Sequence, residues 1–333
     1  MEQKKVSISD VARRAGVSIT TVSRVINNVP TVTQENRRKV EEAIAFYKYN
    51  PNVSAQRLAR GLNNSVGLIM PGYPGIFYSF YAVELIRGVG HACETLRLDL
   101  LFHITDGYNP LNTQNVGGFV FADIIENRRQ VEMALEAGVP SVIINNVVED
   151  MDVSYIAIDN VQGGYMAADY LINLGHQRIA TVTGNLKTQG GAQRLEGFRK
   201  ALLGRGVPVR EEYFYEGDYS RRCARLAGEQ FLALSEWPTA IFAASDEMAL
   251  ELMAVIMEKG LKVPEDISVI GYDDNPAGLY GAIGLTTMRQ PLFQMAENAV
   301  RHLHALVMGK KKTTAKVVMT PELIIRDSCC PPK

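Results

Sequence analysis

The sequence contains little cysteine, and none of it is spaced for a metal site or a disulfide framework. No C-x-x-C pair occurs, and two of the four cysteines are neighbours in a short Pro-rich tail; the four are Cys93, Cys223, Cys329 and Cys330. This usage is typical of proteins kept in a reducing compartment. We therefore expect a cytoplasmic protein without a structural metal or a cofactor.

Long hydrophobic runs are also missing. The N-terminus is polar and lacks the apolar core of a signal peptide. The longest charge-free stretch, residues 61–83, is interrupted by three consecutive polar residues, two prolines and four glycines. Such a stretch fits a buried strand followed by a turn better than a membrane span. We expect no membrane association.

Enzyme signatures are absent as well. Residues 184–191 are glycine-containing but are not followed by the Gly-Lys-Ser/Thr of a phosphate loop, and no G-x-S-x-G motif occurs. His302 and His304 are two residues apart on an expected helix, so they point in different directions and cannot share a metal. Asp246 and Asp273 would suit an acid/base pair, which leaves a sugar hydrolase open. A sugar kinase is the enzyme to test first, although no phosphate loop supports it.

Charge is unevenly distributed along the chain. Of the 35 Lys and Arg residues, 11 lie in residues 1–62 beside 5 of the 36 Asp and Glu residues, a net charge of +6 there and −7 in the remainder. A basic head on an acidic body predicts that only the head meets a polyanion. Chance solvated charge is the alternative that charge alone leaves open.

The head carries the signals of three short helices. Ser7 and Asp10 have the spacing of a capping box, Gly16 supplies a turn, and Ser18 is placed to cap a second helix. The predicted helices cover residues 8–15 and 19–27 and a segment that begins after Thr33.

Two short helices joined by a tight glycine turn are the helix-turn-helix arrangement, whose second helix enters the major groove of DNA. An ordinary three-helix bundle is the alternative, which the basic charge and the small polar face of the second helix disfavour. The residues expected to face base edges are Ile19, Thr20, Ser23 and Arg24, and Asn27 is also assigned to DNA binding.

The residues of the head also resemble a known family. The segments SDVARRAGVS at residues 9–18 and TVSRVIN at residues 21–27 are similar to the lactose/galactose repressor (LacI/GalR) family of bacterial transcription regulators. The resemblance implies a helix-turn-helix domain over residues 1–50 and a hinge helix over residues 51–62. It also implies a homodimer on a near-palindromic operator in double-stranded DNA, because two-fold symmetry doubles a short contact.

In the hinge, Asn52 is placed to cap a helix that is too short to be stable alone. The resemblance assigns Asn52, Ala55 and Leu58 to DNA binding, with Leu58 as an apolar wedge in the minor groove. A plain linker is the alternative interpretation of Leu58.

The rest of the chain alternates apolar β-rich runs with helical stretches, a rhythm that predicts parallel sheets with helices on both faces. Expected strands cover residues 66–70, 99–103, 118–121, 141–145, 179–183, 213–215, 240–244 and 268–272. Expected helices cover residues 81–96, 128–137, 161–174, 194–205, 220–234, 246–259 and 292–308. The fold class is therefore an all-α head plus an α/β body.

Signatures in the body, such as LGHQRIA at residues 174–180 and VPEDISVIGYD at residues 263–273, are also similar to this family. They imply an effector-binding and dimerisation domain over residues 63–328. Its two doubly wound subdomains are of periplasmic-binding-protein type, and the chain crosses between them near residues 160 and 290. The effector is a sugar or sugar-like metabolite between the subdomains, and the matching positions are Phe77, Tyr78, Asn145, Arg194, Tyr219, Asp246, Asp273 and Gln290.

These residue types suit the binding of a sugar-like effector. Aromatic rings offer flat apolar faces, Arg194 donates hydrogen bonds, and carboxylates accept hydrogen bonds from hydroxyl groups. Arg194 as a helix-terminal ion-pair residue and Asp246 as a helix cap are the structural alternatives. The prediction is a DNA-binding transcriptional repressor that is controlled by a small molecule and is not an enzyme. A secreted sugar-binding protein is the other alternative, which the missing signal peptide and the DNA-binding head disfavour.

The sequence departs from the family pattern at several places. Asn145-Asn146 stands where Asp-Arg is usual, which removes a charge pair, so the ligand is not expected to be a typical hexose. Ser245 replaces an asparagine, and Gly75-Ile76 replaces Asn-Pro. The segment from His103 to Gly117 is about ten residues short and has no room for a full helix.

Overall fold

The computed structural model describes residues 6–26, 29–47, 49, 64–72, 76–310 and 313–333. The chain divides into two compact units, residues 1–63 and 64–333, and each is described by itself. The hinge positions expected from the sequence lie outside the described residues.

The first unit contains the three predicted helices, which are α1 (Ile8–Ala15), α2 (Ile19–Ile26) and α3 (Gln34–Tyr47). Ser7 and Asp10 form both bonds of the predicted capping box, and Gly16 ends α1 in the left-handed region at φ 65°. The three helices share a small core that includes the fully buried Val11, Val22 and Val40. This packing fixes the orientation of α2 relative to α1 and α3.

The second unit contains two six-stranded sheets. The first has the order β11-β5-β4-β3-β1-β2, and its strands are β1 (Ser65–Pro71), β2 (Asp99–Thr105), β3 (Gly118–Phe121), β4 (Ser141–Ile144), β5 (Ser154–Ile158) and β11 (Lys316–Met319). The second has the order β12-β10-β9-β8-β6-β7, and its strands are β6 (Ile179–Val182), β7 (Phe214–Tyr215), β8 (Ala240–Ala243), β9 (Ser268–Asp273), β10 (Thr286–Arg289) and β12 (Glu322–Ile324). All described pairings are parallel except that of β10 with β12.

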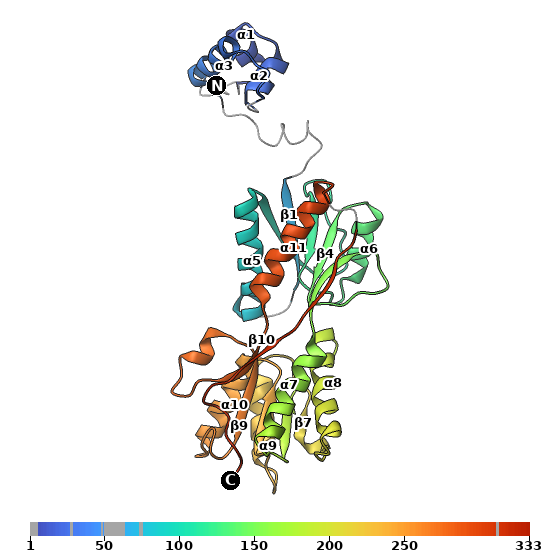
Figure 1. Ribbon diagram of the computed structural model, residues 1–333, viewed down its shortest axis with the longest axis vertical. Helices are drawn as coiled ribbons and strands as arrows, with labels where there is room; N and C mark the ends of the chain where they lie inside the picture. Colours follow the sequence, from blue (N-terminus) through green and yellow to red (C-terminus); the bar gives the residue numbers. More distant parts are fainter. Residues whose placement is uncertain (1–5, 27–28, 48, 50–63, 73–75, 311–312) are drawn as a thin grey trace. The chain divides into compact units, whose positions relative to one another are not determined.

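Helices cover both sheets and make each a layered subdomain (Figure 1). In the first subdomain, α5 (Phe80–Leu96) and α11 (Leu292–Val307) pack together on one face, and α6 (Arg128–Glu136) lies on the other. In the second subdomain, α7 (Asn160–Asn173) and α8 (Gln189–Gly204) cover one face. The opposite face carries α9 (Arg221–Leu232) and α10 (Asp246–Glu258). Short 3₁₀ turns complete the set: η1 (Ile76–Tyr78), η2 (Glu211–Tyr213) and η3 (Pro276–Leu279).

The chain passes between the two subdomains three times: after β5, after β10, and between β11 and β12. Each subdomain is therefore built from segments that are far apart in the sequence, as the colours of Figure 1 show. The sequence analysis did not anticipate the third passage. No described helix is long and apolar enough to cross a membrane.

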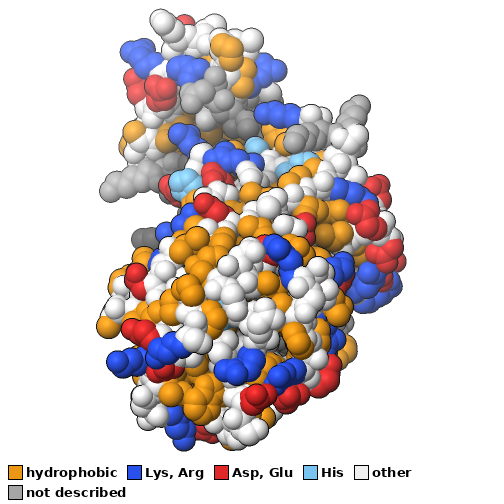
Figure 2. Space-filling model, turned by 60° about the horizontal axis from the view of Figure 1, so that its bottom comes forward, with side chains coloured by type: hydrophobic (Ala, Val, Ile, Leu, Met, Phe, Trp, Pro, Cys, Tyr) orange, Lys and Arg blue, Asp and Glu red, His pale blue; other side chains and the backbone are white. Residues whose placement is uncertain are grey.

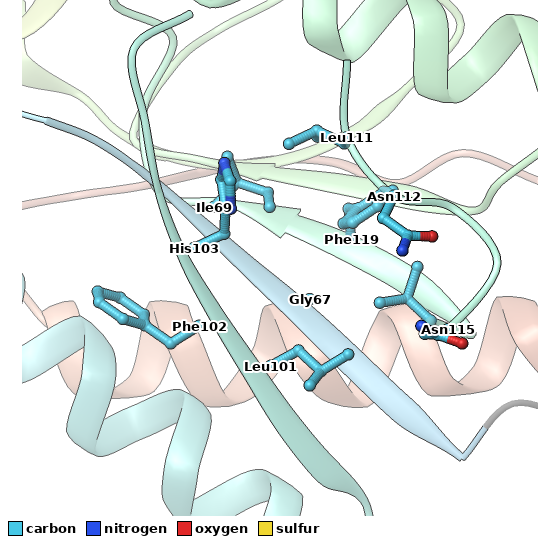
Figure 3. A pocket seen from close by; sticks show the side chains of 10 residues that line it. Gly67, Ile69, Leu101, Phe102, His103, Leu111, Asn112, Asn115 and Phe119 are labelled. Carbon is cyan, nitrogen blue, oxygen red and sulfur yellow. The ribbon is translucent and has the colours of Figure 1, made fainter. Parts of the chain in front are cut away.

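Residues 106–117 contain no helix, as the short spacing predicted. The segment instead runs over β1 and β3 and leaves a hollow of about 170 Å³ that Leu111, Asn112 and Asn115 line from one side (Figure 3). Leu101 and His103 of the edge strand β2 line its other side and are exposed to solvent. The absence of the helix thus bares one face of β2.

The molecular surface mixes charges of both signs. On the face drawn in Figure 2, Lys and Arg side chains are interspersed with Asp and Glu, with hydrophobic side chains between them. Many of these charges are paired along or between helices, as in Arg225 with Glu251 and Glu258. The exposed pair of Arg225 with Glu258 adds little stability, whereas Glu251 is buried.

Candidate functional site

Helix α2 presents the side chains that the sequence analysis assigned to DNA bases. Thr20 and Arg24 are exposed, Ile19 is 50% exposed, and Ser23 is half-buried. The opposite face of α2 is anchored by the buried Val22 and Val25. A polar, exposed face on an anchored helix is what entry into a major groove requires.

The start of α2 is fixed by Ser18, whose hydroxyl accepts from the backbone amide of Thr21 at 3.1 Å. The remaining residues assigned to DNA lie outside the described residues: Asn27, Asn52, Ala55 and Leu58. Their DNA contacts stay predictions.

A second candidate site lies in the second unit, where strands end. Asn145 directly follows β4, Asp273 ends β9, Asp246 begins α10 after β8, and Gln290 directly follows β10. In parallel sheets, ligands bind outside the carboxyl ends of the strands. Six of the eight predicted effector residues are buried or half-buried there: Asn145, Arg194, Tyr219, Asp246, Asp273 and Gln290.

Arg194 is a buried cation without a carboxylate in contact among the described residues. Its Nε donates to Asn160 Oδ1 at 2.9 Å and its Nη1 to the Ala244 carbonyl at 2.6 Å, while the guanidinium lies 3.8 Å from the ring centre of Tyr272. It is in the second turn of α8, so it is not a helix-terminal ion-pair residue. Neutral oxygens and an aromatic face hold Arg194 and leave its positive charge for another group.

Asp273 and Gln290 form a pair beside this cation. Gln290 Nε2 donates to Asp273 Oδ1 at 2.5 Å. Burial raises the pKa of Asp273 to about 6, and the charge of Arg194 opposes that rise. Gln290 Oε1 is buried and has no hydrogen-bond partner in the described structure, so the pair retains an unused acceptor.

Asp246 is occupied by the protein itself. Its carboxylate accepts from the Thr287 hydroxyl and from the Asn275 backbone amide, both at 2.6 Å. Burial, and then the charge of Asp273, raise the pKa of Asp246 well above its usual range. The helix cap is Ser245 and not Asp246. Asp246 therefore orders the loop around η3, and its carboxylate has little remaining capacity to accept hydrogen bonds from a ligand.

The structure reveals a carboxylate that the sequence analysis missed. Asp123 follows β3 and lies beside Asn145, whose Nδ2 is 3.4 Å from Asp123 Oδ2. The Ile124 amide donates to Asp123 Oδ1 at 2.8 Å. Burial raises the pKa of Asp123 to about 6, against the lowering effects of these bonds and of Arg194. The acid expected at position 145 is thus supplied by the neighbouring strand.

Three of the predicted effector residues have unusual backbones. Asn145, Tyr219 and Asp273 adopt positive φ angles of 71°, 68° and 122°. Such angles are costly for residues other than glycine and concentrate at functional sites. Tyr219 also lies against Gly184, where a Cβ would come within 2.1 Å of the ring. The backbone thus directs these side chains at some cost.

Phe77 and Tyr78 lie apart from this buried group. Tyr78 is 89% exposed and Phe77 is 60% exposed. The Phe77 ring contacts Phe102 of β2, with ring centres 6.1 Å apart. Their assignment to the effector stays a prediction.

A pair of hydrogen bonds joins the subdomains at the margin of this group. Gln189, the first residue of α8, accepts from the Val147 amide at 2.7 Å and donates to the Val147 carbonyl at 3.1 Å. The buried polar residues therefore lie where the two subdomains meet. No group of His, Cys, Asp and Glu in the described chain is arranged to hold a metal.

Comparison with known proteins matches both units. The family model for bacterial regulatory proteins of the lacI family matches residues 7–52, and that for a periplasmic binding protein-like domain matches residues 168–329. The HTH-type transcriptional regulator DegA of Bacillus subtilis is 34% identical over 339 residues, which cover 98% of this chain and 99% of that protein.

Solved structures of similar proteins match almost the whole chain. A lac repressor dimer bound to operator and the anti-inducer ONPF is 29% identical with a TM-score of 0.86, covering 98% of this chain and 100% of that one. A complex of the transcriptional regulator CelR with cellobiose is 31% identical with a TM-score of 0.74, covering 97% and 99%. The fold predicted from the sequence is thereby confirmed.

Proposed function

Because the chain belongs to the lacI family of bacterial regulatory proteins, which are DNA-binding transcriptional regulators and not enzymes, we propose that it is a repressor controlled by a sugar-like effector in the cleft between its subdomains. As a dimer it binds a near-palindromic operator. The solved relatives support this proposal, since one is a dimer bound to operator and another is a complex with cellobiose.

The observation that carries the effector site is the state of Arg194. A buried guanidinium held only by neutral oxygens and a ring is costly unless a negative or polar partner arrives. The cleft around it presents Asp273, Gln290 and Asn145 at strand ends. Hydroxyl groups of a sugar match such a mixture of donors and acceptors.

The proposed coupling joins the cleft to the DNA-binding head. An effector that binds one spacing of the subdomains better than another shifts their equilibrium, and about 1–3 kcal/mol is typical of such coupling. The hinge helix expected from the sequence at residues 53–60 would be too short to be stable alone, and we propose that this shift acts on DNA binding through it.

Replacement of Arg194 by alanine tests the site. We expect Arg194→Ala to lose the effector response while effector-free binding to operator remains. The matched control is Arg199→Ala on the same helix, whose guanidinium is exposed and lies over Phe214. A thermal-shift screen of sugars identifies the ligand, and titration of each variant with and without operator measures the coupling. An Arg194→Ala protein that binds and responds like the parent would show that the effector binds elsewhere.

A further inference from the structure

Two buried hydrogen-bond acceptors of the site have no partner in the described part of the chain. They are Oδ1 of Asn145 and Oε1 of Gln290, residues that are 8% and 5% exposed. Both amide nitrogens already point at carboxylates, Asn145 at Asp123 and Gln290 at Asp273. The two free oxygens are therefore fixed as acceptors, because exchanging the amide atoms would break those bonds.

The acceptors form two similar pairs, one from each subdomain. Asp123 and Asn145 come from the ends of β3 and β4 in the first subdomain. Asp273 and Gln290 come from the ends of β9 and β10 in the second. Each pair combines a carboxylate with an unpartnered amide oxygen, and each calls for a ligand that donates.

Charge in the cleft is unbalanced in the same direction. Arg194 is the cation that acts on both Asp123 and Asp273. Its hydrogen bonds go to neutral oxygens, and it lies in the second subdomain with Asp273. No positive group of the described chain contacts Asp123, whose partners are a backbone amide and asparagine side chains. A buried carboxylate without a cation is unfavourable, so the site of Asp123 lacks one positive charge.

We propose that the effector carries a positively charged nitrogen, bound by Asp123 and Asn145, on a polyhydroxylated frame whose hydroxyls meet Asp273, Gln290 and Arg194. An ammonium group supplies both features that the Asp123 side lacks, since it has several donors and a positive charge. The inference rests on the proposed function and adds to it the chemical class of the ligand.

The same arrangement disfavours anionic ligands. A sugar acid or sugar phosphate would bring a further negative charge to a site that already contains the carboxylates of Asp123 and Asp273. Arg194 alone would have to offset that charge, and it lies on the side of Asp273. A neutral sugar satisfies the acceptors but leaves Asp123 without a counter-charge.

Matched sugars separate these classes. For the gluco, galacto and manno frames, the full-length protein is titrated calorimetrically with the 2-amino sugar, its N-acetyl derivative, the parent hexose and the uronic acid. N-acetylation keeps the nitrogen and removes its charge. We expect an amino sugar to bind at least tenfold more tightly than its three counterparts.

Two variants locate the preference. Asp123→Asn should reduce the preference for the amine to about twofold or less, and Asn145→Asp should increase it by adding a second carboxylate beside the first. Asp152→Asn, an exposed acid in the same subdomain, is the control and should leave the preference unchanged. Thermal melts confirm that each variant is folded.

The outcomes distinguish this inference from the proposed function. One outcome is that hexoses or uronic acids bind, amino sugars do not, and Arg194→Ala abolishes the binding. That outcome supports the proposed effector site and contradicts the inference that the effector carries an amine. If an amino sugar binds equally to the parent, Asp123→Asn and Arg194→Ala, neither proposal holds. If no amino sugar in the panel binds, or if Asp123→Asn retains the full preference, the inference is overturned.

Discussion

Gln189 and Val147 belong to different subdomains, yet the side-chain amide of Gln189 pairs with both backbone groups of Val147, as one strand pairs with another. The two hydrogen bonds measure 2.7 and 3.1 Å. They can exist only at this spacing of the subdomains, so they stabilise one arrangement of the cleft over more open ones. A contact of this kind contributes to any affinity that depends on closure.

Removing this contact should therefore weaken effector binding without unfolding the protein. For Gln189→Ala we expect affinity to fall about fivefold or more, since the lost bonds contribute about 1 kcal/mol or more in the closed arrangement alone. The measurement is calorimetric titration with the identified effector. Lys187→Ala, an exposed neighbour, is the control. Equal affinities of the parent and Gln189→Ala would mean that closure is not linked to binding.

The buried charge of Asp123 should make stability depend on pH. Its pKa is raised to about 6 in the folded protein from an ordinary value of 3.8, so the folded state retains a proton that the unfolded state loses between these values. The contribution of Asp123 to stability is therefore fully present below the unfolded pKa and is lost as pH rises through about 6.

Asp123→Asn removes this loss. Its amide oxygen still accepts from the Ile124 amide, and Asn145 can turn its own oxygen towards the new amide. We expect the effector-free variant to be more stable than the parent by up to about 2–3 kcal/mol at pH 8, with the gain shrinking towards pH 4. Urea unfolding at several pH values measures it. A gain that is independent of pH, or a loss at pH 8, would contradict the assignment.

Gly184 should be required for the position of Tyr219. A Cβ at residue 184 would lie 2.1 Å from Cζ of the Tyr219 ring, so the ring has to leave its place in Gly184→Ala. We expect a loss of stability of about 1–3 kcal/mol and at least tenfold weaker effector binding. Gly204→Ala at the end of α8 is the control, because nothing lies within 4 Å of its added Cβ. Unchanged effector affinity in Gly184→Ala would exclude Tyr219 from the site.

Arg24 should read a base. It is exposed in the last turn of α2, while the buried Val25 beside it holds the helix in place. Arg24→Ala should cost about 1–3 kcal/mol in operator binding and relax the preference at one base position. A selection from randomised operators measures both effects. Arg38→Ala, exposed on α3 beside Glu42, is the control and should leave base preference intact.

Most helices and strands were predictable because their own residues encode them. The helix expected at residues 128–137 is observed at Arg128–Glu136, and the strand expected at residues 118–121 is observed unchanged. Four strands were missed. β5 is apolar and fully buried, so its own residues carried a signal that was overlooked. β10 is rich in threonine, and β11 is mostly exposed at an edge of its sheet. β11 and β12 form by pairing with β5 and β10, from which they are distant or separate in sequence.

The candidate site was predictable only as separate positions. The change to Asn145-Asn146 suggested the loss of a charge pair, whereas the structure shows a carboxylate next to Asn145. That carboxylate belongs to Asp123, which approaches Asn145 because β3 and β4 pair in parallel. The register between two strands cannot be predicted from either segment alone, so the sequence did not show that Asp123 lies next to Asn145. The same reason explains why the contact of Gln189 with Val147 was not foreseen.

The three passages between the subdomains have a consequence for synthesis of the chain. Strands β3 and β4 emerge early, but the helix that covers their apolar side chains, α11, begins only at Leu292. Val142 and Ile144 therefore wait uncovered while the whole second sheet up to β10 is translated. A nascent chain with such a face exposed is prone to aggregate and is a natural client for chaperones. The first subdomain thus begins to form first and is completed only after most of the second has been made.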